Sequence, residues 1–334
     1  MRRLLVGGSV AGMQLEDVRA LVAEDLRRVD QVIVERLASD VVLVNQISQY
    51  IIGGGGKRLR PLSVLLAARA CEYTGRHHVE AAAIIEFIHT ATLLHDDVVD
   101  GSEMRRGRDT ANHVFGNQAS VLVGDYLYSR SFQMMVSLDD LRIQGVMADA
   151  TNTIAMGEVL QLMNAHDPDT TEERYFEVIY RKTAKLFEAG AQMAAILANA
   201  PRPVEQAMIA YGRHLGTAFQ LVDDMLDYRA NREELGKNLG DDLAEGKPTL
   251  PLIHALSHAP PAEAARIRAA IEEGGLDDLE AITRTIESSG GLEYTARLAQ
   301  RERDLATGAL ADLPDSAYKQ ALHALADFAV SRTH

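Results

Sequence analysis

The sequence predicts an all-α protein, and three observations support this class. Apolar residues recur every three or four positions along almost the whole chain, whereas the strict alternation of a half-buried strand is scarce. Apolar residues make up 47% of the chain and aromatic residues only 5%, with Ala and Leu prominent, which favours helices. Glycine and proline punctuate the periodic segments, as in NAPRP and SHAPPA, and indicate where one helix ends and the next begins.

The periodic segments predict the helices in order. Residues 15–50 are expected to form one or two amphipathic helices, and the segment GGGGKRLRP at 53–61 then breaks the chain. Pro61 suits the first position of the next helix, 61–74, and a long helix is expected over 79–100. A loop, GSEMRRGRDT, follows this long helix. The remaining helices are expected over 111–116, 119–137, 140–165, 172–199, 203–229, 249–257, 261–273, 277–289, 290–310 and 315–331.

Composition limits the class of protein. No change in composition divides the chain, so residues 14–334 are expected to form a single domain, and residues 1–13 an N-terminal extension that lacks the features of a signal peptide. The formal net charge of −14 argues against nucleic acid and anionic membranes as main partners. No apolar run is long enough to predict a transmembrane helix. The single cysteine, Cys71, excludes an internal disulfide and suggests the reducing cytoplasm.

Two acidic clusters share the pattern D-D-x-x-D and end the apolar segments IIEFIHTATLLH and GTAFQLV. On a helix, the carboxylates of each cluster fall within one side, and the first and last stack one turn apart. A solvated helix face would be polar further along its length, so two matching clusters favour metal binding. Carboxylates without cysteine select hard cations, most simply Mg²⁺, which keeps waters and takes substrate phosphates as further ligands. The candidate metal ligands are Asp96, Asp97, Asp100, Asp223, Asp224 and Asp227.

Basic residues occur in segments of their own. Arg105 and Arg106 follow the first acidic cluster, and KRLR precedes a helix N-terminus, where an anion is favoured. Basic segments beside two acidic clusters predict two anionic substrates, one held through metal and one held directly by Arg and Lys. His89 shares the helix face of Asp96, whereas His95 is expected to point away. The other candidates are Lys57, Arg60, Lys182, Thr183, Gln220, Lys237 and Lys247.

One further acidic pair does not repeat the motif. Asp241 and Asp242 lack the x-x-D continuation, and we expect them in a loop as solvated or supporting residues.

These motifs together resemble those of the trans-isoprenyl diphosphate synthases. The segments GGGGKRLRP, IHTATLLHDDVVD, MRRG, GDYLYSRSF, GEVLQL, KTAKLF, FQLVDDMLDY and GKNLGDDLAEGKPTLPL look like the family's motifs in the family's order, over roughly residues 14–334. The resemblance implies an isoprenoid-synthase-type helical bundle around a deep central cavity, usually a homodimer. It also implies condensation of isopentenyl diphosphate with an allylic diphosphate such as farnesyl diphosphate. The expected product is a long all-trans polyprenyl diphosphate, with octaprenyl for quinone side chains favoured.

The resemblance also implies roles for the candidate residues. About three Mg²⁺ ions would bridge both acidic motifs to the allylic diphosphate. Their likeliest direct ligands are Asp96, Asp100 and Asp223, with Asp97, Asp224 and Asp227 ligating or supporting. Isopentenyl diphosphate would be held by Lys57, Arg60, His89 and Arg106. The allylic substrate, and the catalysis of its ionisation, would be served by Arg105, Lys182, Thr183, Gln220, Lys237 and Lys247.

The growing tail must leave the site through the bundle. Going back along the helix from Asp96, the candidates for the cavity wall are Thr92, Ala91, Ile88 and Ile84. In this family an aromatic residue near the position of Ala91 stops short chains, so the small residue here predicts passage of a longer tail. Phe132, on the following helix, is the candidate for a deeper floor.

Several alternatives remain open. A synthase of geranylgeranyl or farnesyl diphosphate would carry the same motifs. A terpene cyclase shares the first D-D-x-x-D, but its second metal motif is normally an Asn/Ser/Glu pattern. A di-iron carboxylate protein would need a second copy of the pair Glu86-x-x-His89, and none is present. A non-catalytic subunit of a heteromer usually lacks one aspartate motif, whereas both are intact here.

Overall fold

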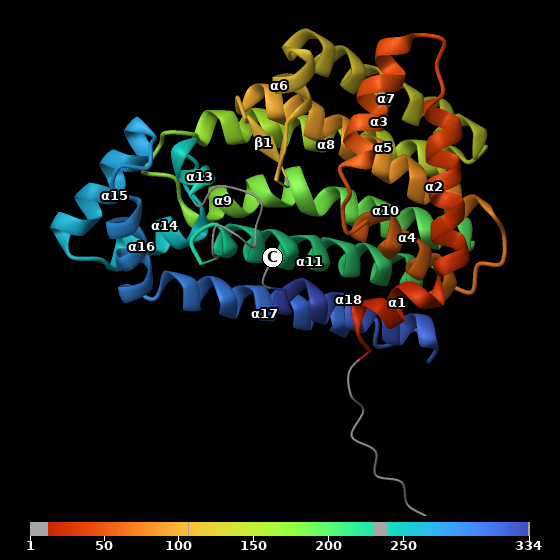
Figure 1. Ribbon diagram of the computed structural model, residues 1–334. Coiled ribbons are helices and arrows are strands. Elements are labelled where there is room, and N and C mark those ends of the chain that lie inside the picture. The colour runs from red at the N-terminus through yellow and green to blue at the C-terminus, as the bar shows by residue number, and fades with distance from the viewer. Residues whose placement is uncertain (1–12, 106, 230–239, 333–334) are drawn as a thin grey trace, which may run out of the picture.

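The computed structural model describes residues 13–105, 107–229 and 240–332, which are overwhelmingly helical (Figure 1). The first half contains α1 (Leu15–Leu21), α2 (Ala23–Leu37), α3 (Val42–Gly53), α4 (Leu59–Ala70), α5 (His77–Val99), α6 (Ala111–Phe115), α7 (Asn117–Ser137) and α8 (Leu141–Asn164). The second half contains α9 (Glu172–Ile179), the π-helix η1 (Tyr180–Ala184), α10 (Lys185–Leu197), α11 (Arg202–Leu226), α13 (Asp241–Ala244), α14 (Leu250–His258), α15 (Pro261–Glu273), α16 (Leu279–Ser288), α17 (Gly291–Ala309) and α18 (Ala317–Ser331).

The predicted all-α class is confirmed. A short antiparallel hairpin, β1 (Met104–Arg105) with β2 (Arg108–Asp109), is the sole sheet within the described ranges, and it replaces part of the loop predicted after the long helix. In the part of the chain that the structure describes, no helix is both long and apolar enough to cross a membrane.

Some predicted boundaries were wrong for local reasons. Residues 15–50 form three helices instead of one or two. Asn45 hydrogen-bonds the backbone N–H and C=O of Ser39 and so stabilises the turn between α2 and α3. Pro61 is the third residue of α4 instead of the first, which the helix tolerates because N–H groups of the first turn lack intrahelical partners. The segment predicted as one helix over 172–199 is interrupted by η1.

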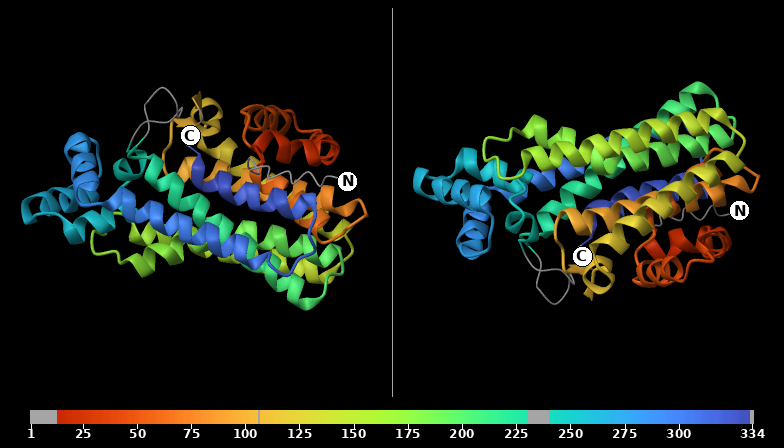
Figure 2. Two further views of the ribbon diagram at one scale, coloured as in Figure 1. Left: turned by 90° about the horizontal axis from the view of Figure 1, so that it is seen from below. Right: turned by 90° about the horizontal axis from the view of Figure 1, so that it is seen from above.

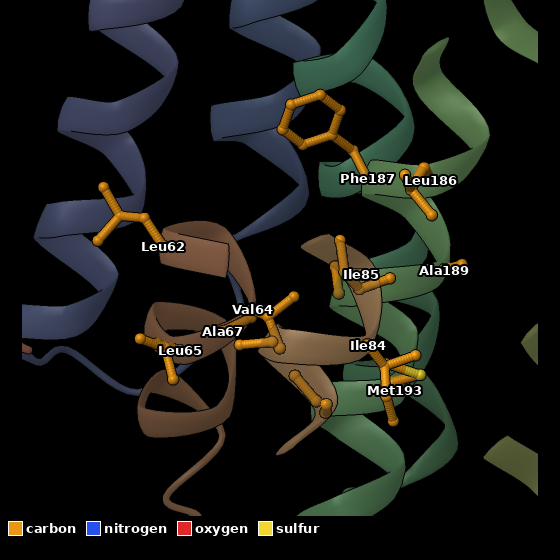
Figure 3. Packing of buried hydrophobic residues seen from close by; sticks show 14 of the residues in the cluster. Leu62, Val64, Leu65, Ala67, Ile84, Ile85, Leu186, Phe187, Ala189 and Met193 are labelled. Carbon is orange, nitrogen blue, oxygen red and sulfur yellow. The ribbon is translucent and has the colours of Figure 1, made fainter. Parts of the chain in front are cut away.

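Helix α10 lies at the centre of the bundle and packs against α4, α5, α8 and α11. Apolar residues cover most of its surface, as expected for a helix enclosed by other helices, and Lys185, Glu188 and Gln192 form one polar stripe along it. Figure 3 shows Leu186 and Met193 of α10 in the same cluster as Val64 of α4 and Ile85 of α5. A Cβ atom on Gly190 would lie 2.8 Å from Val64 Cγ2, so the missing side chain permits this close approach.

Helix α11 connects two groups of buried side chains. Its first half packs into the larger cluster with α4, α5 and α10, and its last turns pack into a second cluster with α9 and α14–α17. Helices α14–α16 project at one end of the molecule (Figures 1 and 2). The two acidic motifs lie at the ends of α5 and α11, so the fold determines how far apart they sit.

Candidate active site

Both acidic motifs occupy the last turn of a helix. Asp100 is the C-cap residue of α5, and Asp227 is the C-cap residue of α11. The C-terminal end of a helix carries partial negative charge, so carboxylates gathered there repel both one another and the helix end. Cations from other elements compensate this charge. They are Arg105, Lys182, Lys247 and Arg332.

Asp97, the second residue of the first motif, is turned into the protein. It is 1% exposed, and its Oδ1 lies 2.8 Å from Arg105 Nε and 2.6 Å from Arg105 Nη2. Burial raises the pKa of Asp97, although Arg105 opposes the shift. This buried pair fastens β1 to the end of α5. The Asp97 carboxylate is therefore already bound by Arg105, and a role of Asp97 in metal binding stays a prediction.

Asp96 and Asp100 remain partly exposed, and each faces a lysine from a distant part of the chain. Lys182 Nζ lies 3.4 Å from Asp96 Oδ2, and Lys247 Nζ lies 2.9 Å from Asp100 Oδ2. Burial alone would lower the pKa of both lysines, but the neighbouring carboxylates outweigh it and raise the pKa. Lys182 also binds Glu158 of α8, at 2.6 Å from Nζ to Oε2. Both ammonium groups are thus held in their charged form.

The second motif repeats this division between buried and exposed carboxylates. Asp224 is 3% exposed and accepts hydrogen bonds from Tyr175 Oη at 2.5 Å and from Gln220 Nε2 at 2.7 Å. Burial raises the pKa of Asp224 to about 7, and neighbouring carboxylates add to the shift. Asp223 is more exposed, and its Oδ1 accepts a hydrogen bond from Arg332 Nη1 at 2.6 Å.

The π-helix η1 connects the two motifs. Lys182 reaches Asp96 in the first motif. The next residue, Thr183, donates a hydrogen bond from Oγ1 to Gln220 Oε1 at 2.8 Å, and Gln220 in turn donates to Asp224 in the second motif. Two consecutive side chains therefore bring both acidic helix ends to one place.

The predicted basic residues of GGGGKRLRP lie beside the same helices. Arg60 Nη1 is 3.1 Å from His89 Nε2, and its guanidinium lies 4.8 Å from the centroid of the Phe187 ring. Lys57 Nζ lies 5.5 Å from the centroid of the Phe328 ring. Burial lowers the pKa of Lys57, and a neighbouring arginine adds to this effect. Arg60 and His89, which the resemblance assigns to one diphosphate site, therefore lie in direct contact, and their role in substrate binding stays a prediction.

A row of aromatic rings runs from these basic residues to the second motif. The rings of Phe187 and Phe219 are 5.9 Å apart, with Arg60 over the first ring. The guanidinium of Arg332 lies 3.8 Å from the Phe219 centroid and reaches Asp223 beyond it. Cation–π contacts of this kind orient guanidinium groups that are partly removed from water. The contacts with Phe187 and Phe219 therefore hold the guanidinium groups of Arg60 and Arg332 in defined positions relative to one another.

A hollow opens beside α5. Its wall combines Gly55 from the glycine-rich segment, His89 and Asp97 from α5, and Arg105 from β1. The sequence predicted that the glycine-rich segment and the arginine loop would serve anionic ligands. The structure brings both to one concave surface.

The exposed carboxylates fit a hard cation. Among the residues that the structure describes, no three carboxyl, thiol or imidazole groups gather closely enough to hold a metal ion by themselves. Mg²⁺ is usually bound through one or two carboxylates together with waters and substrate phosphates, so such a cage is not required. The side chains of Asp96, Asp100 and Asp223 are 15%, 19% and 42% exposed and offer oxygen donors. These residues therefore fit Mg²⁺ bound jointly with a diphosphate.

The residues predicted to line the tail cavity lie in or beside the hydrophobic core. Ile88 and Ala91 are fully buried, and Thr92 Oγ1 donates a hydrogen bond of 2.8 Å to the backbone carbonyl three residues earlier. Phe132 of α7 packs against the larger cluster, with its ring 5.3 Å from that of Tyr128. Their role in product length stays a prediction.

The remaining predicted residues have mixed outcomes. His95 turns away from Asp96, as predicted, and its Nε2 lies 3.2 Å from the backbone carbonyl of Val121. Asp241 and Asp242 were predicted in a loop, which was wrong: they begin the one-turn helix α13 after a left-handed glycine, and the Asp242 N–H donates to Asp227 Oδ2 at 3.2 Å. Two predicted substrate residues lie outside the described residues. They are Arg106 and Lys237.

Sequence reasoning missed three side chains that contact the site. Glu158 binds Lys182, Tyr175 binds Asp224, and Arg332 binds Asp223. A lone carboxylate in the segment GEVLQL could have indicated the first. Nothing in the local sequence distinguishes Tyr175 or Arg332, because both contacts depend on the packing of distant helices.

Comparisons with known proteins show the family of the chain. A family model described as polyprenyl synthetase matches residues 41–287. Octaprenyl diphosphate synthase of Escherichia coli (strain K12) is 57% identical over 321 residues, which is 96% of this chain and 99% of that protein. The all-trans-nonaprenyl-diphosphate synthase (geranyl-diphosphate specific) of Rhodobacter capsulatus is 46% identical, over 95% and 98% of the two chains.

A solved structure extends the similarity to the fold. It is the polyprenyl synthase of Caulobacter crescentus CB15, complexed with calcium and isoprenyl diphosphate. It matches this chain with a TM-score of 0.94 and 43% identity, over 98% of this chain and all of that one.

Proposed function

The chain belongs to the polyprenyl synthetase family and is a prenyltransferase, and we propose that it builds an all-trans octaprenyl diphosphate. The reaction joins isopentenyl diphosphate units to an allylic diphosphate, with farnesyl diphosphate as the proposed primer. The product length is supported by the 57% identity to an octaprenyl diphosphate synthase. The nonaprenyl enzyme at 46% identity and the shorter-chain synthases of the same fold are the competing outcomes.

One observation carries the assignment of the site. The consecutive residues Lys182 and Thr183 contact the first and the second acidic motif, respectively, the latter through Gln220. A diphosphate placed between the motifs would meet Lys182 and Lys247 directly. It would also face the exposed carboxylates through metal. This arrangement suits an allylic diphosphate that must lose its leaving group.

Mg²⁺ would be held by Asp96, Asp100 and Asp223, with Asp97, Asp224 and Asp227 ligating or supporting. The family is Mg²⁺-dependent, and we propose about three ions bound together with the diphosphate. When bound, Mg²⁺ supplies Lewis-acid stabilisation of the negative charge that develops on the leaving group.

The residues of the chain contribute to ionisation by charge and by orientation. Lys182 and Lys247, with Arg105 and the predicted Lys237, hold and neutralise the allylic diphosphate while its carbon–oxygen bond breaks. The resulting allylic cation is delocalised. The dipoles of Thr183 and Gln220 face it and stabilise it without forming a bond.

Condensation and elimination complete the cycle. Lys57, Arg60, His89 and the predicted Arg106 hold the diphosphate of isopentenyl diphosphate, so that its alkene faces the cation. The alkene electrons form the new carbon–carbon bond. A proton then leaves the adjacent carbon for the departed diphosphate, and the double bond forms again. Water must be kept out during this sequence, because it would convert the cation to an alcohol.

A single incubation tests this function. The purified chain receives farnesyl diphosphate, isopentenyl diphosphate and Mg²⁺, and mass spectrometry measures the product length. We expect octaprenyl diphosphate as the main product, and none in EDTA. Release of diphosphate without isopentenyl diphosphate would instead indicate a cyclase. Activity that required a second protein would indicate a heteromeric subunit.

We also propose that the protein is a cytoplasmic homodimer. Met156, Val159 and Met163 lie on one face of α8 at helical spacing and are 49%, 58% and 70% exposed. A continuous exposed apolar stripe favours burial against another protein surface, and a second copy is the partner that the family resemblance implies. The cytoplasmic location is supported by the single cysteine.

A further inference from the structure

The π-helix η1 is an uncommon backbone feature placed where the site needs it. A π-turn inserts one extra residue into a helix, is rare, and is found mostly at functional sites. Here it carries Lys182 and Thr183, the two residues that contact the acidic motifs. In a regular α-helix each residue adds about 100° of rotation. If the π-turn rewound as regular α-helix, Lys182 would therefore rotate about the helix axis and point away from Asp96. Some other part of the protein must therefore stabilise the turn.

Glycines allow α8 and α11 to pack closely against η1 from two sides. A Cβ atom on Gly157 of α8 would lie 2.9 Å from the backbone nitrogen of Lys182, and one on Gly216 of α11 would lie 2.6 Å from Ala184 Cα. These approaches confine the backbone of the turn. They do not by themselves choose between a π-turn and an α-turn, because both have a backbone at that position.

A buried carboxylate contacts both ends of the turn. Glu188 of α10 is 4% exposed, and its oxygens lie 3.2 Å and 3.4 Å from Tyr180 Oη. It also binds Lys185 Nζ and Arg213 Nε, both at 2.9 Å. Tyr180 is the first residue of η1, and Lys185 is the residue directly after it. Glu188 therefore joins the start and the end of the π-turn to each other.

The same group ties the turn to both flanking helices. Arg213 comes from α11, and its guanidinium lies 4.7 Å from the centroid of the Tyr180 ring. Lys185 Nζ also lies 2.8 Å from Asp149 Oδ2 of α8. Hydrogen bonds between charged partners in a buried setting are stronger and more directional than neutral ones. The contacts are specific to the position of Tyr180, which an α-helical turn would shift.

We propose that Glu188 is a positioning residue for prenyl transfer: through Tyr180 and Lys185 it maintains the π-turn that presents Lys182 and Thr183 to the allylic diphosphate. The proposal rests on the function proposed above, in which these two residues serve the allylic substrate. Glu188 itself contacts Tyr180, Lys185 and Arg213, and acts through the backbone of η1.

The test compares Glu188→Gln with a matched control. Glu188→Gln preserves shape and removes the charge that pairs with Lys185 and Arg213. Glu205→Gln is the control, since Glu205 joins the same two helices through Gln192 at 2.8 Å but lies away from η1. Hydrogen exchange of peptides covering 180–188 is measured without substrates, and KM for each substrate and kcat are measured with them.

We expect faster exchange over 180–188 in Glu188→Gln. We also expect a KM for the allylic diphosphate raised about tenfold, a kcat lowered about 10- to 100-fold, and a KM for isopentenyl diphosphate within about twofold of wild type. Misplaced residues would also release more prenyl alcohol, because the cation would be less well enclosed. Glu205→Gln should leave all of these quantities unchanged.

Three outcomes would overturn the proposal: wild-type exchange over 180–188, wild-type kinetics despite faster exchange, or equal rises in KM for both substrates. If Glu188→Gln does not fold, Tyr180→Phe gives the same test, because it removes one hydroxyl and leaves the buried charges paired. A Lys182→Ala variant with normal kinetics would refute the role assigned to Lys182 in the proposed function. The exchange result would still decide whether Glu188 maintains the turn.

Discussion

Lys182 Nζ lies 2.6 Å from Glu158 Oε2, and this pair joins the π-helix to α8 at the edge of the first acidic motif. Burial raises the pKa of Glu158 to about 7, with Lys182 opposing the shift and Asp96 adding to it. The carboxylate therefore sits in an environment that favours its protonated form far more than water does. Glu158 should therefore contribute to the pH dependence of stability.

We predict that Glu158→Gln changes the pH dependence of stability in EDTA. Between pH 4.5 and about 7 the folded protein keeps the Glu158 proton and the unfolded chain loses it, so this group's contribution to stability falls as pH rises. The wild type should lose up to about 1.4 kcal/mol per pH unit relative to the variant across this window. Urea unfolding measures the difference. Parallel curves for the two proteins, with exposed Glu177→Gln as control, would contradict the predicted shift.

The two kinds of aspartate in each motif should behave differently on substitution. Asp96→Ala and Asp223→Ala remove partly exposed carboxylates, so turnover should fall by about 100-fold or more while the circular dichroism spectrum is preserved. Asp97→Asn instead removes the buried carboxylate that binds Arg105. This change should lower the free energy of unfolding by about 3 kcal/mol. Near-normal Mg²⁺-dependent turnover in either Ala variant would remove the metal assignment.

Product length should respond to two buried positions. Ala91→Phe should shorten the product to about fifteen or twenty carbons, and it should also cost about 1–3 kcal/mol because the site is already filled. Phe132→Ala should lengthen the product, because it opens space below the tail. Mass spectrometry of products at a temperature where both variants are folded checks this. The control is Ser129→Ala, an exposed position on the same helix as Phe132. Unchanged products in both variants would exclude these residues as wall and floor.

The proposed dimer should depend on the apolar stripe of α8. Val159→Asp places a charge in the centre of the stripe, and burying it without a partner is unfavourable. Analytical ultracentrifugation should then show monomers where the wild type sediments as a dimer. Val34→Asp, at a 66% exposed position on α2, serves as the control. A wild-type chain that already sediments as a monomer would refute the proposal.

Most of the helices could be predicted from the sequence, and the candidate site residues could be named from it. Helical periodicity is repeated over many turns, so long elements such as α5, α7 and α17 were placed within a few residues. The two D-D-x-x-D motifs could be recognised because each ends an apolar helix. Carboxylates at the end of a buried helix require cations that compensate their charge. Arg60 and His89 were both assigned to one diphosphate site, and the structure shows that they are in contact.

Other features depended on contacts that no local pattern records. The π-turn has the same composition as a helix, and its contacts with Gly157 of α8 and Arg213 of α11 depend on tertiary packing. The division of each motif into buried and exposed carboxylates follows from Arg105 in one case and Tyr175 in the other. Equivalent residues in the sequence thus acquired different partners through tertiary packing.

The ion pair between Lys247 and Asp100 joins residues separated by 147 positions. Such a contact closes a very long loop of chain, whose entropy must be lost before the contact contributes any stability. Contacts of high sequence separation slow folding, whereas helices form from neighbouring residues in microseconds or less. During refolding from denaturant, helical signal should therefore return well before catalytic activity.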